Sequence, residues 1–311
     1  MKGKQNMKKI LAIALVLTMV LALGATAFAD GKLIGYTCMD GTNPFFIALE
    51  GAIKEVVEEH GDTLISLDPQ NSNETQIDQI EDMISRKVEA LFVNPVDKDG
   101  IIAALDKVKE AGIPMFGFDT EVADLSYLET YAGSDNYNAG YVCGVDLVEK
   151  LPDGGPIIVL DSPTMQSVVD RTDGFLAAIE GKGFEVVSQI DCMGNQEQGN
   201  LNGTDALTAH PDAVAIFGGN DPTALGAYAA AEAAGSKALI YGVDGSPDIK
   251  ALIADGKVTG TGAQSPMTIG KTIAELYYKW LDGEEIEARY PIETFMINSD
   301  NIADYNNGGW Q

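Results

Sequence analysis

Eight short runs of almost wholly apolar residues are the feature of this sequence that most restricts its fold. Strands that are apolar on both faces are typical of a parallel sheet covered by helices on both sides. The pattern therefore predicts an α/β fold. The runs lie at 33–38, 63–67, 89–94, 113–118, 156–160, 185–190, 213–217 and 238–243.

Amphipathic stretches separate these runs. In the first stretch, Phe46, Leu49 and Ile53 fall on one face of a helix, while Lys54 and Glu55 face water. Strands that alternate with helices form right-handed βαβ units. Helices are expected at 46–60, 73–86, 99–111, 137–150, 170–182, 222–234 and 266–282.

The runs form two groups. Four lie before residue 120 and four between residues 156 and 243, and the segment 126–136 between them is typical of a crossing strand followed by a turn. This spacing predicts two doubly wound lobes with parallel sheets.

The first 29 residues are predicted to be a secretory signal peptide. Four lysines precede a long apolar stretch that ends in Ala27-Phe28-Ala29, a small-x-small cleavage site. A transmembrane anchor is the alternative, but the small-residue exit favours cleavage. No cysteine stands at the cleavage point, so a lipid anchor is not indicated. Cleavage after Ala29 would leave 282 residues, enough for two domains.

The chain is strongly acidic. Its formal net charge is −27, and loss of the four signal lysines would make it −31. Such a surface repels nucleic acid and anionic membranes, and argues weakly against anionic ligands. Cys38, Cys143 and Cys192 are an odd number, so at most one disulfide is possible, and the sequence does not show which.

Polar residues follow five of the apolar runs. In open α/β sheets, ligands bind outside the carboxyl ends of the strands. Each residue alone is also a normal helix cap, but five in two groups favour a binding site. At 220–221 we expect Asp221 to cap the next helix and Asn220 to face the cleft. The five residues are Asn94, Asp119, Asp161, Asn220 and Asp244.

These residue types indicate the chemistry of the ligand. Carboxylates and amides offer acceptors and donors that match neighbouring hydroxyls, which points to an uncharged, polyhydroxylated molecule. Phe45 and Phe46 are candidates for the apolar face of a sugar ring, with core packing as the alternative reading.

Motifs for catalysis, metals and cofactors are not found. Neither of the two histidines has metal-ligand spacing, and there is no nucleophile elbow, Walker loop or dinucleotide fingerprint. The sequence thus predicts a protein that is not an enzyme and holds no metal or cofactor.

Several motifs, taken in order, carry a resemblance that covers residues 31–293. The chain resembles the type I periplasmic sugar-binding proteins, nearest to the ribose-binding branch that serves ABC importers. The motifs are "NPFF" (43–46), "NPVD" (94–97), "FD" (118–119), "DRTDGF" (170–175), "LTAHPD" (207–212), "NDPTALGA" (220–227), "GVDGSPD" (242–248) and "AQSPMTIG" (263–270).

The resemblance implies two Rossmann-like lobes joined by a three-segment hinge, with ligand held between them. It assigns residues 30–133 plus 265–293 to the N-terminal lobe, and 134–264 plus 294–311 to the C-terminal lobe. Phe45 and Phe46 would bracket a sugar ring. The polar contacts it implies are Asn43, Asn94, Asp119, Arg171, Asn220, Asp244 and Gln264.

The implied function is capture of a monosaccharide or polyol by a periplasmic or secreted monomer. The partner would be an ABC permease with its ATPase. The alternative is a sugar or autoinducer-type sensor that presents its ligand to a chemoreceptor or sensor kinase. A transcriptional repressor with the same core would need a basic DNA-binding segment before residue 31, where the apolar signal stands.

The sequence departs from the ribose-type site at four places, one of which is the Cys38-Met39 region, where that site has a polar residue near the first strand end. Thr120 stands where that site has Arg, Val243 where it has Phe, and "CMGN" (192–195) where an aromatic ring is expected. Fewer rings and donors leave other pentoses, hexoses, polyols and furanose-like ligands open.

Overall fold

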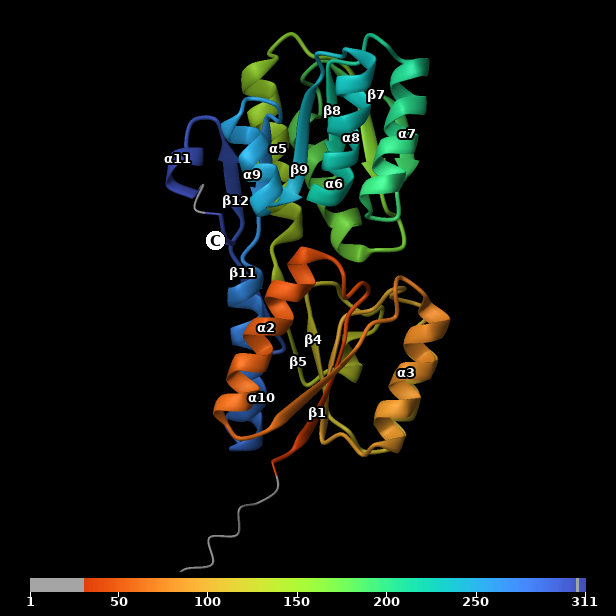
Figure 1. The fold of residues 1–311 in the computed structure, drawn as a ribbon, viewed down its shortest axis with the longest axis vertical. Helices are drawn as coiled ribbons and strands as arrows, with labels where there is room; N and C mark the ends of the chain where they lie inside the picture. Colours follow the sequence, from red (N-terminus) through yellow and green to blue (C-terminus); the bar gives the residue numbers. More distant parts are fainter. Residues whose placement is uncertain (1–30, 306–307) are drawn as a thin grey trace, which may run out of the picture.

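The computed structural model describes residues 31–305 and 308–311, so the predicted signal peptide lies outside the described residues. Two α/β lobes follow one another along the long axis of the molecule (Figure 1). Each lobe is built on a six-stranded sheet. The α/β prediction with two lobes is confirmed.

The first sheet is wholly parallel, with strand order β11-β5-β4-β3-β1-β2. Four of its strands are the first four apolar runs, and β5 is the crossing strand expected within 126–136. The strands are β1 (Leu33–Thr37), β2 (Thr63–Leu67), β3 (Ala90–Val93), β4 (Met115–Phe118), β5 (Thr130–Ser134) and β11 (Arg289–Ile292).

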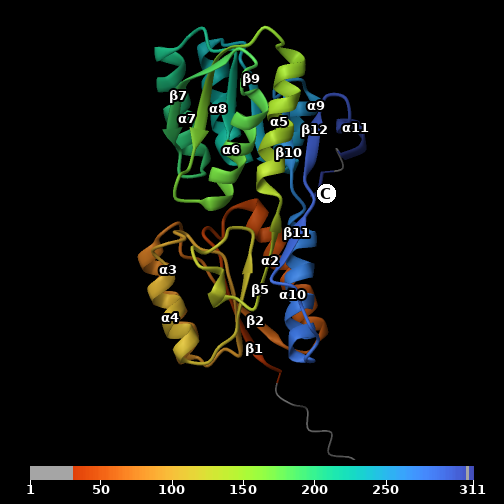
Figure 2. The ribbon, with the colours of Figure 1, turned by 180° about the vertical axis from the view of Figure 1, so that it is seen from behind.

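Helices cover both faces of this sheet (Figures 1 and 2). One face packs against α2 (Pro44–Glu59) and α10 (Pro266–Leu281). The other packs against α3 (Asn73–Ser85) and α4 (Ile102–Glu110), and a short 3₁₀ turn, η1 (Leu125–Tyr127), precedes β5. Burial on both faces explains why the runs are apolar throughout.

The second sheet has strand order β12-β10-β9-β8-β6-β7. It is parallel except for β12, which pairs antiparallel with β10 at one edge. Four of its strands are the remaining apolar runs. The strands are β6 (Gly155–Asp161), β7 (Phe184–Asp191), β8 (Ala215–Gly218), β9 (Leu239–Asp244), β10 (Gly260–Ala263) and β12 (Phe295–Asn298).

Helices cover this sheet on both faces as well. One face packs against α5 (Asn136–Lys150) and α6 (Gln166–Ile179). The other packs against α7 (Gln196–Ala209), α8 (Asp221–Ala234) and α9 (Pro247–Ala254), and α11 (Ile302–Tyr305) follows β12. Helix α6 begins at residue 166, four residues before the predicted start at 170.

Helix α7 was not among the predicted helices, because its contact face is made of small residues. Gly199 and Gly203 of α7 lie against α8, and a Cβ on Gly226 of α8 would lie 2.3 Å from the Gln196 carbonyl oxygen. Because the backbones of α7 and α8 lie so close together, there is no room for a row of large apolar side chains between the two helices. The periodic signal of an amphipathic helix is therefore weak in this segment.

The chain passes between the two sheets three times, after β5, after β10 and between β11 and β12. Two of these crossings are bonded together. The Asp135 amide donates to the Ile292 carbonyl oxygen at 2.9 Å, and the Thr294 hydroxyl donates to the Asp135 carbonyl oxygen at 3.0 Å. These two crossings are therefore joined by hydrogen bonds beside the junction of the lobes.

Candidate ligand-binding site between the lobes

A small cavity lies between the lobes, at the carboxyl ends of both sheets. Its volume is about 30 Å³, room for about two water molecules. Eight of the nine residues predicted from the sequence line it: Asn43, Phe45, Phe46, Asp119, Arg171, Asn220, Asp244 and Gln264. Met39, Met165, Ser167 and Val168 complete the lining.

Asn94 is the predicted residue that does not line the cavity. It is fully buried behind Asp119, and its side-chain amide donates to Asp119 Oδ2 at 3.1 Å and to the Phe118 carbonyl oxygen at 3.2 Å. Its Oδ1 accepts from the Met39 amide at 3.1 Å. Asn94 therefore positions Asp119 and the loop after β1.

Asp119 follows β4 and presents one free oxygen. Its Oδ2 accepts from Asn94 and from the Thr120 hydroxyl at 3.1 Å, while its buried Oδ1 has no hydrogen-bond partner. Burial raises the pKa of Asp119, and the Arg171 charge partly opposes that rise. The backbone φ of Asp119 is 59°, in the left-handed region that non-glycine residues adopt infrequently.

Asp244 holds the corresponding place at the end of β9. Its Oδ1 accepts from Gln264 Nε2 at 2.7 Å, and its Oδ2 accepts from the Asp221 amide at 3.2 Å. Burial raises the pKa of Asp244 to about 8; the nearby Arg171 opposes the rise, and the Asp221 carboxyl adds to it. Its φ of 149° is also strained, so both lobes place a strained acid at the cavity.

Arg171 is held rigidly in the second turn of α6. Its Nε donates to Asn136 Oδ1 at 2.8 Å and its Nη1 to the Gly219 carbonyl oxygen at 3.0 Å. The same Nη1 lies 3.4 Å from Asp244 Oδ1. The guanidinium thus reaches the cavity with its orientation set by two loops of the second lobe.

Asn43 serves as a helix cap and as a cavity wall at once. Its Oδ1 accepts from the Phe45 amide at 3.0 Å, which begins α2, and Pro44 occupies the first helical turn. Both phenylalanines are buried, with ring centroids 5.4 Å apart in an edge-to-face arrangement. Phe45 and Phe46 therefore both pack in the core and line the cavity.

The expectation for residues 220–221 was wrong about the cap. Asn220 caps α8, accepting from the Thr223 amide at 2.9 Å, and its Nδ2 donates to the Gly194 carbonyl oxygen at 2.8 Å. Asp221 is fully buried and accepts from the Ser246 amide at 2.7 Å. The Asp221 carboxylate therefore links the start of α8 to the loop after β9. It can do so because Asp221 lies one residue after the cap, in the first turn of α8.

Asp161 also ends a strand, but it does not line the cavity. Its carboxylate accepts from the Ser162 amide at 2.8 Å, the Thr172 hydroxyl at 3.1 Å and Gln189 Nε2 at 2.6 Å. All of these partners lie in the second lobe, so this acid organises the start of α6.

One match decides which family the chain is in. The model of the periplasmic binding protein domain matches residues 34–285. The chain belongs to the periplasmic binding protein family.

Relatives agree with this assignment over nearly the whole chain. The chain is 30% identical over 294 residues to the ribose import binding protein of Escherichia coli K12, covering 94% of this chain and 99% of that protein. It is 30% identical over 262 residues to the D-apiose import binding protein of Actinobacillus succinogenes 130Z, covering 82% and 84%.

A solved structure agrees as well. An ABC transporter periplasmic solute binding protein from A. succinogenes 130Z, with bound D-allose, superposes with a TM-score of 0.80 at 28% identity. The match covers 88% of this chain and 100% of that chain.

Sequence reasoning missed several residues that line the cavity of this periplasmic binding protein. Ser167 lies in a segment with no motif. Met39 lies in the Cys38-Met39 region, which was noted only as a departure from the ribose-type site. Met165 and Val168 give no signal, because an apolar residue beside a cavity cannot be told from a core residue by pattern alone.

Other side chains of the described residues show no sign of metal or redox chemistry. The three cysteines are buried and unpaired. No group of His, Cys, Asp and Glu among the residues described here has the geometry to hold a metal ion. Over the same part of the chain, no helix is both long and apolar enough to cross a membrane.

Proposed function

We propose that this chain is an extracytoplasmic solute-binding protein that captures a monosaccharide or polyol between its lobes and delivers it to an ABC importer. The observation that carries the proposal is a pair of buried acceptors without partners. Asp119 Oδ1 and Gln264 Oε1 both belong to residues that line the small cavity between the lobes. Two hydroxyl donors of a sugar would satisfy them, and such groups are costly to bury unpaired.

The remaining walls suit the same ligand. Phe45 and Phe46 offer apolar edges and faces for ring C–H groups, and Arg171 offers a fixed donor to a ring or hydroxyl oxygen. Nothing in this set requires proton transfer or a nucleophile, so we propose binding without catalysis.

Ligand capture would involve movement of the lobes. The residues that line the cavity come from both lobes and most of them are buried, so a sugar can enter only when the lobes part, and the lobes would then close over it. We propose that the three crossings, near residues 135, 265 and 293, form the hinge. Residues 30–133 plus 265–293 and residues 134–264 plus 294–311 would then move as two bodies.

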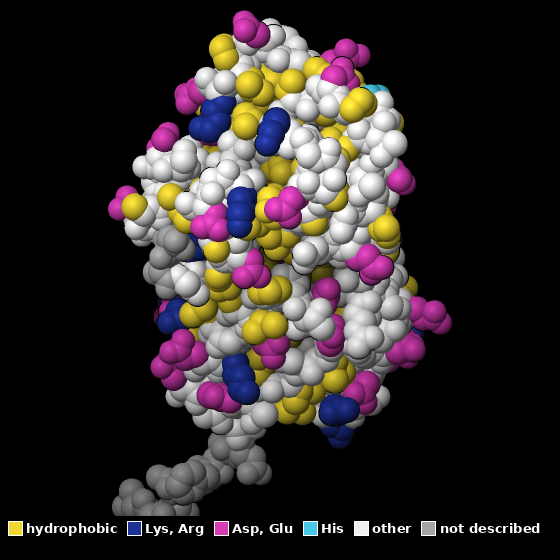
Figure 3. Space-filling model, turned by 45° about the horizontal axis from the view of Figure 1, so that its top comes forward, with side chains coloured by type: hydrophobic (Ala, Val, Ile, Leu, Met, Phe, Trp, Pro, Cys, Tyr) yellow, Lys and Arg dark blue, Asp and Glu magenta, His cyan; other side chains and the backbone are white. Residues whose placement is uncertain are grey.

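Location and partners follow from the same proposal. Cleavage near Ala29 would release the mature chain outside the cytoplasm as a monomer. The acidic surface suits an exported protein that remains dissolved: Figure 3 shows Asp and Glu side chains spread over the visible face. The closed lobes would be presented to the permease and its ATPase.

Isothermal titration of the mature chain against a panel of sugars tests the proposal. The panel holds D-ribose, D-allose, D-apiose, D-fucose and myo-inositol, and mass spectrometry of the native protein identifies any ligand that co-purifies. We expect at least one polyhydroxylated ligand with micromolar affinity or better. The proposal fails if no sugar or polyol binds and none co-purifies.

A further inference from the structure

A second, larger cavity adjoins the small inner cavity. Its volume is about 430 Å³, within the range of small-molecule binding sites. It lies between the loop after β1 in the first lobe and the starts of α7, α8 and α9 in the second lobe. Asn43 and Asp244 line both cavities, so the inner cavity and this outer pocket are neighbours that share part of their walls.

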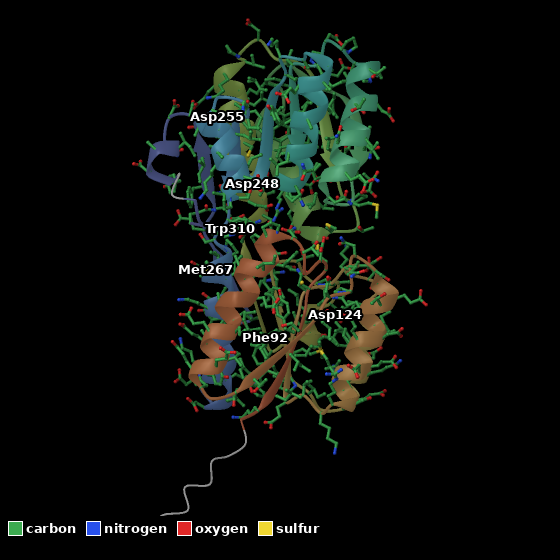
Figure 4. All side chains as sticks on the ribbon, in the orientation of Figure 1. Phe92, Asp124, Asp248, Asp255, Met267 and Trp310 are labelled. Atoms are coloured by element: carbon green, nitrogen blue, oxygen red, sulfur yellow. The ribbon has the colours of Figure 1, made fainter. Side chains whose placement is uncertain are left out.

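An aromatic wall of the outer pocket comes from the C-terminal tail. The half-buried ring of Trp310 lies at the junction of the lobes (Figure 4), and its centroid is 5.8 Å from that of Phe45 at an interplanar angle of 82°. The next residue anchors it: Gln311 Nε2 donates to the Asp244 carbonyl oxygen at 3.0 Å, and the buried Lys250 donates to Gln311 Oε1 at 3.1 Å. The indole is therefore a fixed platform.

The charges around the outer pocket exclude one class of ligand. Asp40, Asp244 and Asp248 line it, and no Lys or Arg does. A phosphate or uronate group would be repelled here, whereas neutral hydroxyls can donate to the carboxylates. An aromatic platform with nearby acceptors suits the apolar face and hydroxyl edge of a sugar ring.

We propose that the outer pocket is a second sugar subsite, so that the chain takes neutral disaccharides and glycosides as well as monosaccharides. The first ring of a disaccharide lies in the inner cavity, as the proposed function requires, and its second ring lies against Trp310. The glycosidic bond passes between Asn43 and Asp244. No aromatic residue stands at 192–195, where the ribose-type site is expected to have one. Gly194 and Asn195 line the outer pocket there instead and leave the pocket open.

Titration of the mature chain with matched pairs of sugars tests the inference. The pairs are D-glucose with cellobiose and D-galactose with lactose. We expect at least one disaccharide or glycoside to bind ten times more tightly, or better, than its free monosaccharide. Gln196→Trp fills the outer pocket from an exposed position and should remove this advantage without weakening the monosaccharide.

Glu197→Trp is the matched control, since Glu197 is exposed on the same turn but does not line the pocket. This variant should keep the advantage. If a monosaccharide binds but no larger sugar gains affinity, or if Gln196→Trp leaves the gain intact, the inference is overturned and the proposed function stands. If no sugar of either size binds, both are overturned.

Discussion

The Thr120 hydroxyl lies 2.7 Å from the Ser167 hydroxyl, across the junction between the two lobes. Thr120 follows β4 of the first lobe and Ser167 lies in the first turn of α6 in the second. Because Thr120 donates to Asp119 Oδ2, Ser167 is the donor in the contact between lobes. The two hydroxyls thus connect the closed arrangement of the lobes to Asp119, whose Oδ1 has no hydrogen-bond partner.

Thr120→Val should weaken closure, since it removes the hydroxyl at nearly constant volume. The bond is worth about 0.5–1.5 kcal/mol, so ligand affinity should fall roughly 2–12-fold. Isothermal titration measures this, with Thr120→Ser as the control that keeps the hydroxyl. Ser167→Ala removes only the contact between the lobes, so its loss should be no larger than that of Thr120→Val, and the double variant should lose no more than Thr120→Val alone. Fully additive losses would show that the two hydroxyls act separately.

Asp244→Ala should reduce sugar affinity by about 5–150-fold, because it leaves Gln264 Nε2 and the Asp221 amide unpaired in a buried site at a cost of about 1–3 kcal/mol. Titration with the sugar that binds best gives the number. Asp255→Ala, an exposed acid of the same lobe (Figure 4), should change nothing. Wild-type affinity in Asp244→Ala would remove this residue from the site.

Arg171→Lys should also weaken binding by an order of magnitude or more. An ammonium group cannot keep the donors to Asn136 and Gly219 while it reaches Asp244, because it lacks the planar fork. Affinity and melting temperature are measured together, with the exposed Arg86→Lys as the control. An unchanged affinity would mean that the charge alone matters at position 171.

The pH dependence of stability should reflect the raised pKa of Asp244. In the folded chain this pKa is about 8, against about 4 in the unfolded chain, so the folded state holds the proton more tightly. This contribution to the free energy of unfolding is complete below about pH 4 and is lost as the pH rises towards 8. Urea titrations at several pH values measure the slope. Asp244→Asn should flatten it, and an equal slope in that variant would place the effect elsewhere.

Gly226→Ala should destabilise the second lobe, because the new Cβ would lie 2.3 Å from the Gln196 carbonyl oxygen of α7. Overpacking of this kind costs about 1–3 kcal/mol, measurable by urea or thermal unfolding. Gly203→Ala is the matched control on the facing helix, where the nearest atom is 3.3 Å away. That variant should be near neutral, since alanine also favours the helix. Equal effects of the two changes would contradict close packing of α7 and α8.

The order of apolar runs and amphipathic stretches determined the two α/β lobes, because strands buried on both faces leave a strong local pattern. The sequence also pointed to Asp119, Asn220 and Asp244, since a polar residue after a buried strand stands out. Asn43, Arg171 and Gln264 carry no such local signal, and only the resemblance to a known family indicated them.

Only the tertiary structure decided how these groups are used. Asn220 and Asp221 are neighbours in sequence, yet the fold gives the cap to one and the loop-bridging role to the other. Asn94 and Asp119 follow adjacent strands, but only Asp119 lines the cavity. Asn94 lies behind it and donates to its carboxylate. Thr120, Ser167 and Trp310 became visible only when distant segments met, because a contact between lobes depends on long-range packing that no short pattern records.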